Sequence, residues 1–266
     1  MINDFEFKEK YNVYDLVNVI KALRSEGGCP WDIEQTHATL KRNLIEESYE
    51  VIEAINKNDM EMLREELGDV LLQVVFHAQI ESENGLFDID DVADENCKKM
   101  IQRHPHVFGE INVNSVDDVL TNWDAIKRSS KGQKTTSQAI DAVPREFPAL
   151  MRADKIQSKA AKAGFDWSEV DGALDRLTEE IEELRNAIAS GKADEISDEL
   201  GDVLFSAVNV SRFVKVDAEE ALTASTDKFV ARFKIVERLA QERSIDMKTV
   251  DLEVLDALWD EAKKSL

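Results

Sequence analysis

The sequence carries the same arrangement of acidic residues twice, at one constant separation. Each copy has two adjacent glutamates, a third glutamate one helical turn later, and then a glutamate and an aspartate one turn apart. The first copy is Glu46, Glu47, Glu50, Glu66 and Asp69. The second copy, 133 residues later, is Glu179, Glu180, Glu183, Glu199 and Asp202. Such an internal duplication predicts two domains of one fold rather than a single large domain.

The spacing within each copy is that of two acidic helix faces. Residues three or four positions apart lie on the same side of a helix. The two acidic faces of one copy can meet only if their helices pack antiparallel. So many carboxylates at close range require a cation. A ligand set made of oxygens, without paired histidine or cysteine, favours Mg2+ or Mn2+ over zinc.

Composition supports a helical fold and excludes one class of partner. The 266 residues are 43% apolar and 33% charged, with only 10 glycines and 4 prolines, which is typical of soluble helical proteins. The net charge of -22 argues against a nucleic-acid-binding surface, because neutralising phosphates requires clustered lysine and arginine. Any phosphate ligand is therefore expected to arrive with a metal.

The cysteines and the apolar segments predict a cytoplasmic protein. Cys29 and Cys97 are the only cysteines and belong to no zinc-binding pattern, so reduced thiols are expected. The segment Met1 to Lys10 is polar and acidic, unlike a signal peptide. The longest apolar stretches are too short to span a bilayer. No membrane anchor is expected.

Hydrophobic periodicity predicts an all-α protein built from two tandem four-helix bundles. The main helices of the first half are expected at about 13–24, 39–57, 60–83 and 89–103. Those of the second half are expected at about 149–163, 172–190, 193–214 and 218–242. Each half ends in one more short helix, around Trp123 and at 252–264. In each half, the second and third helices form an antiparallel hairpin that carries the acidic faces.

The domain boundaries follow from composition. Residues 129–136 are rich in serine, lysine, glycine and glutamine, and Pro144 and Pro148 follow them. The prediction is an N-terminal domain at 1–128, a linker at 129–148 and a C-terminal domain at 149–266. Gly68 and Gly201 lie inside otherwise helical runs, where glycine costs about 1 kcal/mol relative to alanine. Close approach of another helix is the expected compensation.

Basic and aromatic residues are repeated as well. A Lys/Arg pair one turn apart and a tryptophan four residues before a lysine occur in both halves: Lys99, Arg103, Trp123 and Lys127, then Lys228, Arg232, Trp259 and Lys263. The pairs are candidate phosphate contacts, the alternative being ordinary basic helix ends stabilised by the helix dipole. Trp259 is a candidate base or ribose contact, whereas the other tryptophans are equally compatible with a core position.

Several alternatives fail on motif grounds. Di-iron bundles need a Glu-x-x-His pair from each of two helices, and the pair Glu34 and His37 has no counterpart in the second half. Walker-type and glycine-rich nucleotide loops are absent. The sequence His104-Pro105-His106 is interpreted as a helix-ending turn, and His77 as a core residue.

The motifs resemble those of the two-domain MazG nucleoside triphosphate pyrophosphohydrolases. They are Glu-Glu-x-x-Glu followed by Glu-x-x-Asp within Glu-Leu-Gly-Asp, in both halves, with Gly-Cys-Pro-Trp-Asp at 28–32, Arg-His-Pro-His-Val-Phe at 103–108 and Gly-Phe-Asp-Trp at 164–167. The resemblance covers nearly the whole chain. Each acidic motif alone is shared with other all-α nucleotide pyrophosphatases such as the dimeric dUTPases.

The resemblance implies a Mg2+-dependent homodimer that hydrolyses nucleoside triphosphates, with broad base and sugar specificity, to monophosphate and pyrophosphate, and whose C-terminal half is the more active. It implies that the metal ligands are Glu180, Glu183, Glu199 and Asp202, and in the first half Glu47, Glu50, Glu66 and Asp69. Glu179 and Glu46 would orient or deprotonate the attacking water. Lys228 and Arg232 would hold the outgoing phosphates, and Trp259 and Lys263 would lie near the nucleotide.

A second class of function stays open on the sequence alone. The same bundle could bind nucleotide and metal as a non-catalytic regulatory protein, or bind a protein partner in a stress response. For the enzyme, the expected setting is housecleaning of the nucleotide pool or stress-linked nucleotide control. Release of pyrophosphate separates the two classes. The preferred nucleotide and any protein partner cannot be deduced from these motifs.

Overall fold

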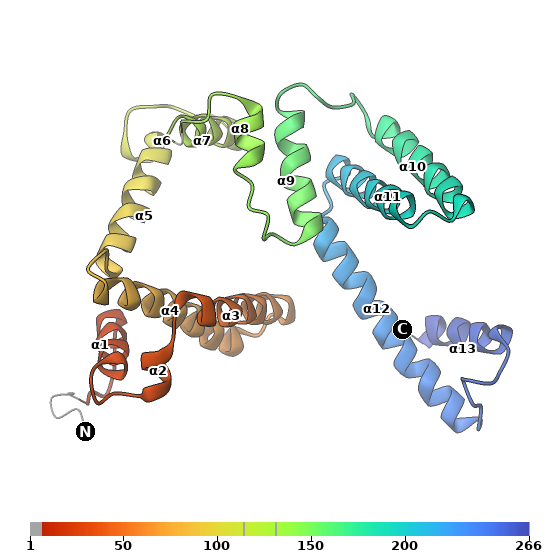
Figure 1. Ribbon diagram of the computed structural model, residues 1–266, viewed down its shortest axis with the longest axis horizontal. Coiled ribbons are helices and arrows are strands. Elements are labelled where there is room, and N and C mark those ends of the chain that lie inside the picture. Colours follow the sequence, from red (N-terminus) through yellow and green to blue (C-terminus); the bar gives the residue numbers. More distant parts are fainter. Residues whose placement is uncertain (1–6, 114, 131, 266) are drawn as a thin grey trace. The chain divides into compact units, whose positions relative to one another are not determined.

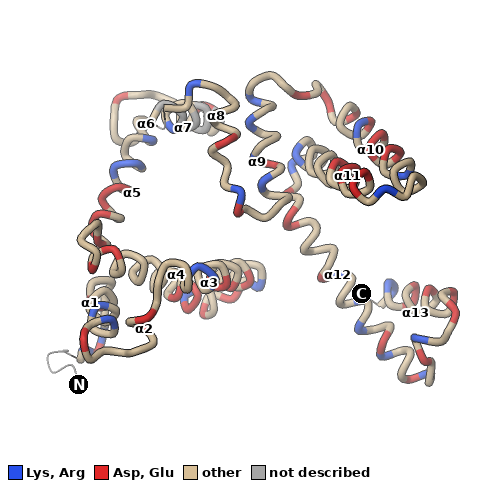
Figure 2. Tube along the Cα trace, in the orientation of Figure 1, with Lys and Arg blue, Asp and Glu red and all other residues tan. Residues whose placement is uncertain are grey.

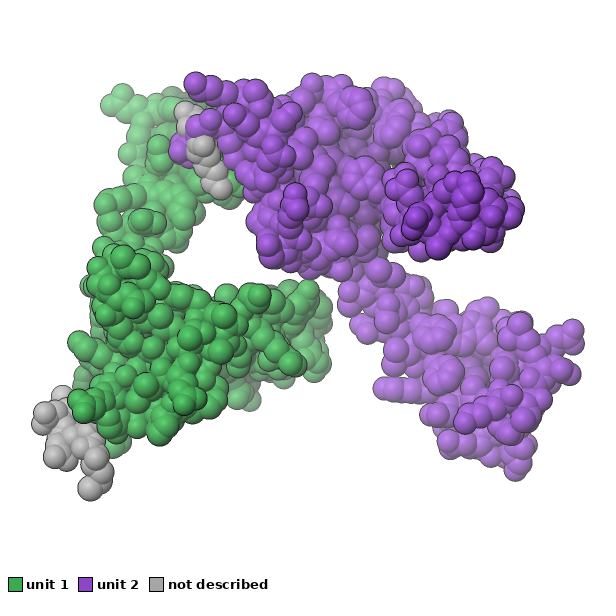
Figure 3. All heavy atoms as spheres, viewed as in Figure 1, with its two compact units in different colours: residues 1–127 green, residues 128–266 purple. Residues whose placement is uncertain are grey.

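The computed structural model describes residues 7–113, 115–130 and 132–265, without the side chains of 117, 120, 121, 124, 128 and 129. All regular elements in these ranges are helices, which confirms the predicted all-α class. The chain divides into two compact units, Met1–Lys127 and Arg128–Leu266 (Figure 3). We call them the first and the second unit. The first six residues, part of the segment judged unlike a signal peptide, lie outside the described ranges.

The first unit is organised around one antiparallel helical hairpin (Figure 1). Its helices are α1 (Val13–Arg24), α2 (Pro30–Glu34), α3 (His37–Lys57), α4 (Met60–Glu83), α5 (Ile89–Arg103), α6 (Pro105–Phe108) and α7 (Val116–Ser130). Helices α3 and α4 form the hairpin, and α1 and α5 both pack on α4. The buried core joins α1, the start of α3 and the second half of α4 through Ile20, Leu40, Val75, Phe76 and Ile80. One end of the hairpin is thereby anchored, and its acidic end lies beyond the core.

The second unit repeats this hairpin. Its helices are α8 (Thr136–Asp141), α9 (Ala149–Ala161), α10 (Val170–Ser190), α11 (Ala193–Phe213), α12 (Ala218–Glu242) and α13 (Leu252–Ser265). Helices α10 and α11 form the hairpin, and α9 packs on both α11 and α12. A separate core of Val236, Leu239, Ala240, Leu258 and Ala262 joins the end of α12 to α13. The segment 129–148, predicted to be a linker, contains α8, which packs on α9.

The turns of the two hairpins are equivalent residue by residue. Asn58 ends α3 with φ 53°, and Gly191, 133 positions later, ends α10 with φ 72°. The backbone N–H of Asn58 donates to the carbonyls of Ala54 and Ile55, and that of Gly191 to the equivalent carbonyls of α10. Left-handed backbone at the end of a helix satisfies carbonyls that lack a partner within the helix. Both connections therefore reverse the chain in the same way and at the same register.

Large apolar side chains remain exposed on the helices that follow each hairpin. On α12, Phe229, Val230 and Phe233 are exposed, and on α5, Met100 and Ile101 are exposed. Helix α5 leads away from the α3–α4 hairpin, and α12 leads away from α9 and α11 (Figure 1). None of the described helices is both long enough and apolar enough to cross a membrane.

Candidate metal centre

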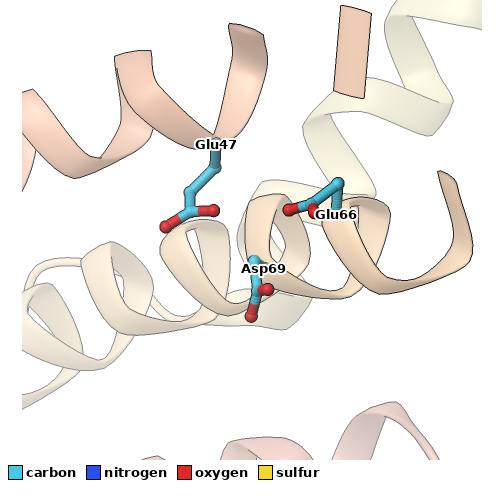
Figure 4. A group of neighbouring side chains, drawn as sticks. All are labelled: Glu47, Glu66 and Asp69. Atoms are coloured by element: carbon cyan, nitrogen blue, oxygen red, sulfur yellow. The ribbon is translucent and has the colours of Figure 1, made fainter. Parts of the chain in front are cut away.

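Each hairpin brings three carboxylates together from its two helices. In the first unit they are Glu47 of α3 with Glu66 and Asp69 of α4; Figure 4 shows the three side chains, with Glu47 and Glu66 pointing toward each other. We call these three the first carboxylate group. The second carboxylate group consists of Glu180 of α10 with Glu199 and Asp202 of α11. Within each group, one oxygen of every residue lies within 4.8 Å of the others.

The groups form because the acidic faces meet across the hairpins. Red acidic residues gather along α3 and α4 and again along α10 and α11 in Figure 2. Glu66 and Asp69 are one turn apart on α4 and so lie on the same face. The turn at Asn58 sets the register at which this face meets Glu47. The predicted antiparallel arrangement of the acidic helices is therefore confirmed in both units.

The second carboxylate group has buried oxygens without a partner. Glu180 is only 3% exposed. Its Oε2 and the Oε2 of Glu199 are buried and accept no hydrogen bond from any described residue. A buried carboxylate oxygen without a donor is strongly destabilising. A divalent cation that prefers oxygen ligands would satisfy both atoms, so the residues present fit such an ion.

Burial and mutual repulsion raise the pKa of four of these carboxyls. Burial is the main cause of the raised pKa of Glu47, and the charges of Asp69, Glu50 and Glu66 add to it. For Glu66 the second cause is the charge of Glu50. Each group therefore resists full ionisation unless a cation lies nearby.

The same pattern occurs in the second unit. Burial raises the pKa of Glu180, while the charge of Arg176 opposes this rise. Burial also raises the pKa of Glu199, with the charge of Glu183 as the next cause. Among the described residues, a positively charged side chain thus acts on the pKa values of the second group but not on those resolved for the first.

The remaining predicted ligands lie beside the groups rather than within them. Glu50 is close enough to Glu47 and Glu66 to raise the pKa of both. Glu183 lies 3.7 Å from Arg176, measured between Oε1 and Nη1. Neither Glu50 nor Glu183 belongs to the carboxylates that lie within 4.8 Å of one another.

The outer glutamates of both copies form exposed ion pairs. Glu46 accepts from Arg42 at 2.7 Å, and Glu179 accepts from Arg176 at 3.0 Å. Neither lies in a carboxylate group. Arg176 was not among the predicted site residues. Its spacing to Glu179 and Glu180 was visible in the sequence, but exposed helix pairs have the same spacing.

Two of the four predicted nucleotide-site residues lie together. The guanidinium carbon of Arg232 on α12 lies 5.9 Å from the ring centre of Trp259 on α13. The ring of Phe229 lies 5.2 Å from the same tryptophan. Lys228 on α12 is exposed, and Lys263 donates to Asp260 at 2.8 Å. In the described part of the chain, none of the four forms a hydrogen bond or ion pair with the second carboxylate group.

The structure tests three further expectations from the sequence. Helix α5 ends at Arg103 and α6 begins at Pro105, which confirms the helix-ending turn at His104. His77 is not a simple core residue, because it is only partly buried and its Nδ1 lies 2.6 Å from that of His37. A Cβ built on Gly68 or Gly201 would meet no atom within 4 Å. The expected close approach of a helix is therefore absent within the described chain.

Taken together, the duplicated hairpins define an all-helical protein with two carboxylate sites suited to a divalent cation. The family model of the MazG nucleotide pyrophosphohydrolase domain matches residues 35–108 and 169–237. The matched ranges contain all ten duplicated carboxylates but stop before α13, which carries Trp259 and Lys263. The chain belongs to the MazG nucleotide pyrophosphohydrolase family and carries its domain twice.

Two relatives match this chain over nearly their whole length, and a third is longer. A nucleoside triphosphate pyrophosphohydrolase of Escherichia coli (strain K12) is 42% identical over 252 residues, which cover 94% of this chain and 96% of the relative. The MazG pyrophosphohydrolase of Thermotoga maritima is 46% identical over 249 residues, 94% of each chain. The uncharacterized protein YabN of Bacillus subtilis (strain 168) is 45% identical over 249 residues but is about twice as long, since these cover 51% of it.

Proposed function

We propose that this chain hydrolyses nucleoside and deoxynucleoside triphosphates between the α- and β-phosphates, with Mg2+ or Mn2+, to give the monophosphate and pyrophosphate. The observation that carries the proposal is the second carboxylate group, whose buried Oε2 atoms on Glu180 and Glu199 receive no hydrogen bond from the part of the chain that the structure describes. Membership of the family and the names of the relatives from E. coli and T. maritima support the reaction.

The proposed metal ligands are the two carboxylate groups with their neighbouring glutamates. They are Glu180, Glu183, Glu199 and Asp202 in the second unit, and Glu47, Glu50, Glu66 and Asp69 in the first. A divalent ion held there supplies charge neutralisation for the triphosphate and activation of water. Glu179, on the exposed side of the second group, orients or deprotonates the attacking water; Glu46 has the same position in the first unit.

The remaining proposed contacts are with the nucleotide. Lys228 and Arg232 bind the outgoing phosphates, because charged donors form the strongest hydrogen bonds to phosphate oxygens. Trp259 lies against the base or ribose, and Lys263 lies beside it. The proximity of Arg232 to the Trp259 ring supports a shared site for these two residues. The burial of Glu180 supports the second unit as the main catalytic unit.

The active form is proposed to be a homodimer. Leu204 and Phe205 on α11 and Phe229 and Phe233 on α12 are exposed, and exposed large apolar side chains in such numbers are typical of an interface. Gly201 reduces the stability of its helix, and the space over it is open among the described residues. A second copy of the chain can approach at this place. The carboxylates and the proposed nucleotide contacts lie on different helical hairpins, so a second copy can complete the site.

The decisive experiment measures the products. Purified full-length protein is incubated with each nucleoside and deoxynucleoside triphosphate and Mg2+, and pyrophosphate is resolved from inorganic phosphate. Equimolar monophosphate and pyrophosphate are expected. Release of single phosphate would contradict cleavage at the proposed bond. Nucleotide binding without any product would instead indicate the non-catalytic regulatory bundle. The relative rates report the preferred base and sugar.

A further inference from the structure

Arg176 connects three of the duplicated acidic residues of the second unit. Its Nη2 lies 2.6 Å from an oxygen of Glu180, and its Nη1 lies 3.0 Å from Glu179 and 3.7 Å from Glu183. All four residues lie on successive turns of one face of α10. The Arg176 side chain is 39% exposed, whereas the Glu180 side chain is almost fully buried. The arginine therefore covers the solvent side of a buried carboxylate.

The two oxygens of Glu180 have different environments. Oε1 forms an ion pair with Nη2 of Arg176, and Oε2 is buried without any donor among the described residues. Holding one oxygen of a carboxylate fixes the direction of the other. Oε2 is thereby left available to the second carboxylate group. Carboxylate ligands of metals are commonly oriented by polar contacts from neighbouring side chains of this kind.

The first unit lacks this arrangement. The residue equivalent to Arg176, 133 positions earlier, is Asn43. The neighbouring Arg42 pairs with the exposed Glu46 at 2.7 Å, with its own side chain largely exposed. No described positive charge is among the causes that shift the pKa of Glu47. The two carboxylate groups, equal in their acidic residues, therefore differ in one basic residue.

We propose that Arg176 is a positioning residue of the second site, which holds Glu180 and Glu179 so that their free oxygens face the metal and the attacking water. This inference rests on the proposed metal role of the second carboxylate group. An arginine suits the task because its planar fork can contact two carboxylates at once, which a lysine cannot reproduce in the same geometry. The first site, with Asn43, holds its glutamates more loosely.

The test measures metal binding directly, without substrate. In full-length protein with Glu47→Gln and Asp69→Asn, only the second group can bind, and free Mn2+ is followed by electron paramagnetic resonance. Arg176→Asn, which introduces the residue of the first unit, is expected to weaken Mn2+ binding about 10- to 100-fold, because loss of a residue that orients a metal ligand typically reduces affinity by this factor. Arg176→Lys, which keeps the charge without the fork, is expected to recover part of this loss.

A matched control is available on the same helix. Arg185 pairs with Glu182 at 2.9 Å, also at i and i+3, and neither residue belongs to a carboxylate group. Arg185→Asn should leave Mn2+ affinity unchanged, and thermal unfolding in the presence of a chelator checks that both variants are folded. Unchanged affinity in Arg176→Asn would overturn the proposal. Tighter binding would overturn it too, since the arginine would then compete with the metal.

The experiment distinguishes a failure of the role proposed for Arg176 from a failure of the proposed reaction. If Arg176→Asn weakens Mn2+ binding while the parent protein releases no pyrophosphate, the positioning role stands and the enzymatic proposal fails. If the parent second group binds no Mn2+ at all, the metal site and the role of Arg176 both fail. If binding weakens and the parent enzyme is active, kcat should fall more than KM rises, because the water and its glutamate are misplaced in the transition state.

Discussion

The Nδ1 atoms of His37 and His77 lie 2.6 Å apart across the α3–α4 hairpin. Their ring centres are 4.9 Å apart and the ring planes differ by 15°, so the rings meet edge to edge and nearly in one plane. His37 donates from Nε2 to Glu81 at 2.5 Å. Glu81, His37 and His77 thus form one hydrogen-bonded chain with a single proton between the rings. The equivalent residues of the second unit are Val214, Val170 and Val210.

This chain predicts a pH dependence that is specific to the first unit. Burial, and then the charge of His37, lower the pKa of His77 from 6.5. The unfolded chain therefore binds more protons than the folded one just below that value, and stability increases with pH. The contribution of His77 to the free energy of unfolding is complete above about pH 6.5 and is lost as the pH falls below this value. Thermal unfolding between pH 5 and 8 should show this loss.

His77→Val, which introduces the residue of the second unit, should flatten that part of the profile. The carboxyls of the two carboxylate groups change the free energy of unfolding with pH in the opposite direction, because their pKa values are raised in the folded chain. The difference between the variant and the parent chain therefore isolates His77. An identical pH profile in both proteins would show that the histidine pair does not titrate during unfolding.

Removal of metal is expected to abolish pyrophosphate release. The reason is the clustering of carboxylates whose pKa values are raised by burial and by one another, with Arg176 as the one described basic side chain that acts on their pKa values. After treatment with a chelator, Mg2+ or Mn2+ should restore turnover and raise the unfolding temperature, since the ion binds only the folded state. Full activity in excess chelator would contradict the proposed role of both groups.

Replacement of a single carboxylate should separate the two units. Glu180→Gln removes a ligand charge of nearly the same shape and is expected to lower kcat about 100- to 1,000-fold, equivalent to about 3 to 4 kcal/mol of transition-state stabilisation. Glu47→Gln should leave most of the activity. Glu182→Gln, on the exposed side of α10, is the control for loss of one negative charge. Equal losses from the first two variants would show that the first unit contributes equally.

The apolar faces predict a dimer in solution. Light scattering at micromolar concentration should give twice the chain mass of 30.1 kDa. Phe233→Asp places a charge on the exposed apolar face of α12 and should shift the particle to the mass of one chain. Lys234→Asp, at the adjacent exposed position, should not. A parent protein that is active as a single chain would rule out a site completed by a second copy.

The hairpin turn predicts a change in stability of defined sign. Gly191 has φ 72°, and apart from its chain neighbours no described atom lies within 4 Å of where a Cβ would be, so alanine there is strained by its backbone alone. Gly191→Ala should reduce the free energy of unfolding by about 1 kcal/mol. Gly191→Asn should cost less, because asparagine tolerates this conformation and occupies the equivalent position 58. Equal costs for both would show that the turn is set by other contacts.

The sequence was most informative where structure depends on local periodicity. The range predicted for α4 agrees with Met60–Glu83, and α3 begins at His37 rather than near 39 because Thr36 and Thr39 cap it reciprocally. The family resemblance is confirmed by the family match. The antiparallel pairing of the acidic helices could also be deduced, because only that pairing joins Glu47 to Asp69.

Other features depended on tertiary contacts that no local pattern encodes. The contact of His37 with His77 requires both the register of the hairpin and particular side-chain rotamers. Arg176 has the same spacing to its glutamate as the exposed pair Arg238 and Glu242, so the sequence could not distinguish a positioning residue from a surface ion pair. The burial of Glu180 distinguishes its pair from the exposed one, and this burial arises only from tertiary packing.

The equivalent turns at Asn58 and Gly191 have a consequence for insertions and deletions. A single residue added between α10 and α11 and taken up into the start of α11 would rotate the later side chains of α11 by about 100° around the helix axis. Glu199 and Asp202 would then face away from Glu180, although both helices and the α12–α13 core could still form. Surface loops of this chain should accept changes of length, whereas each hairpin connection should accept changes of residue only.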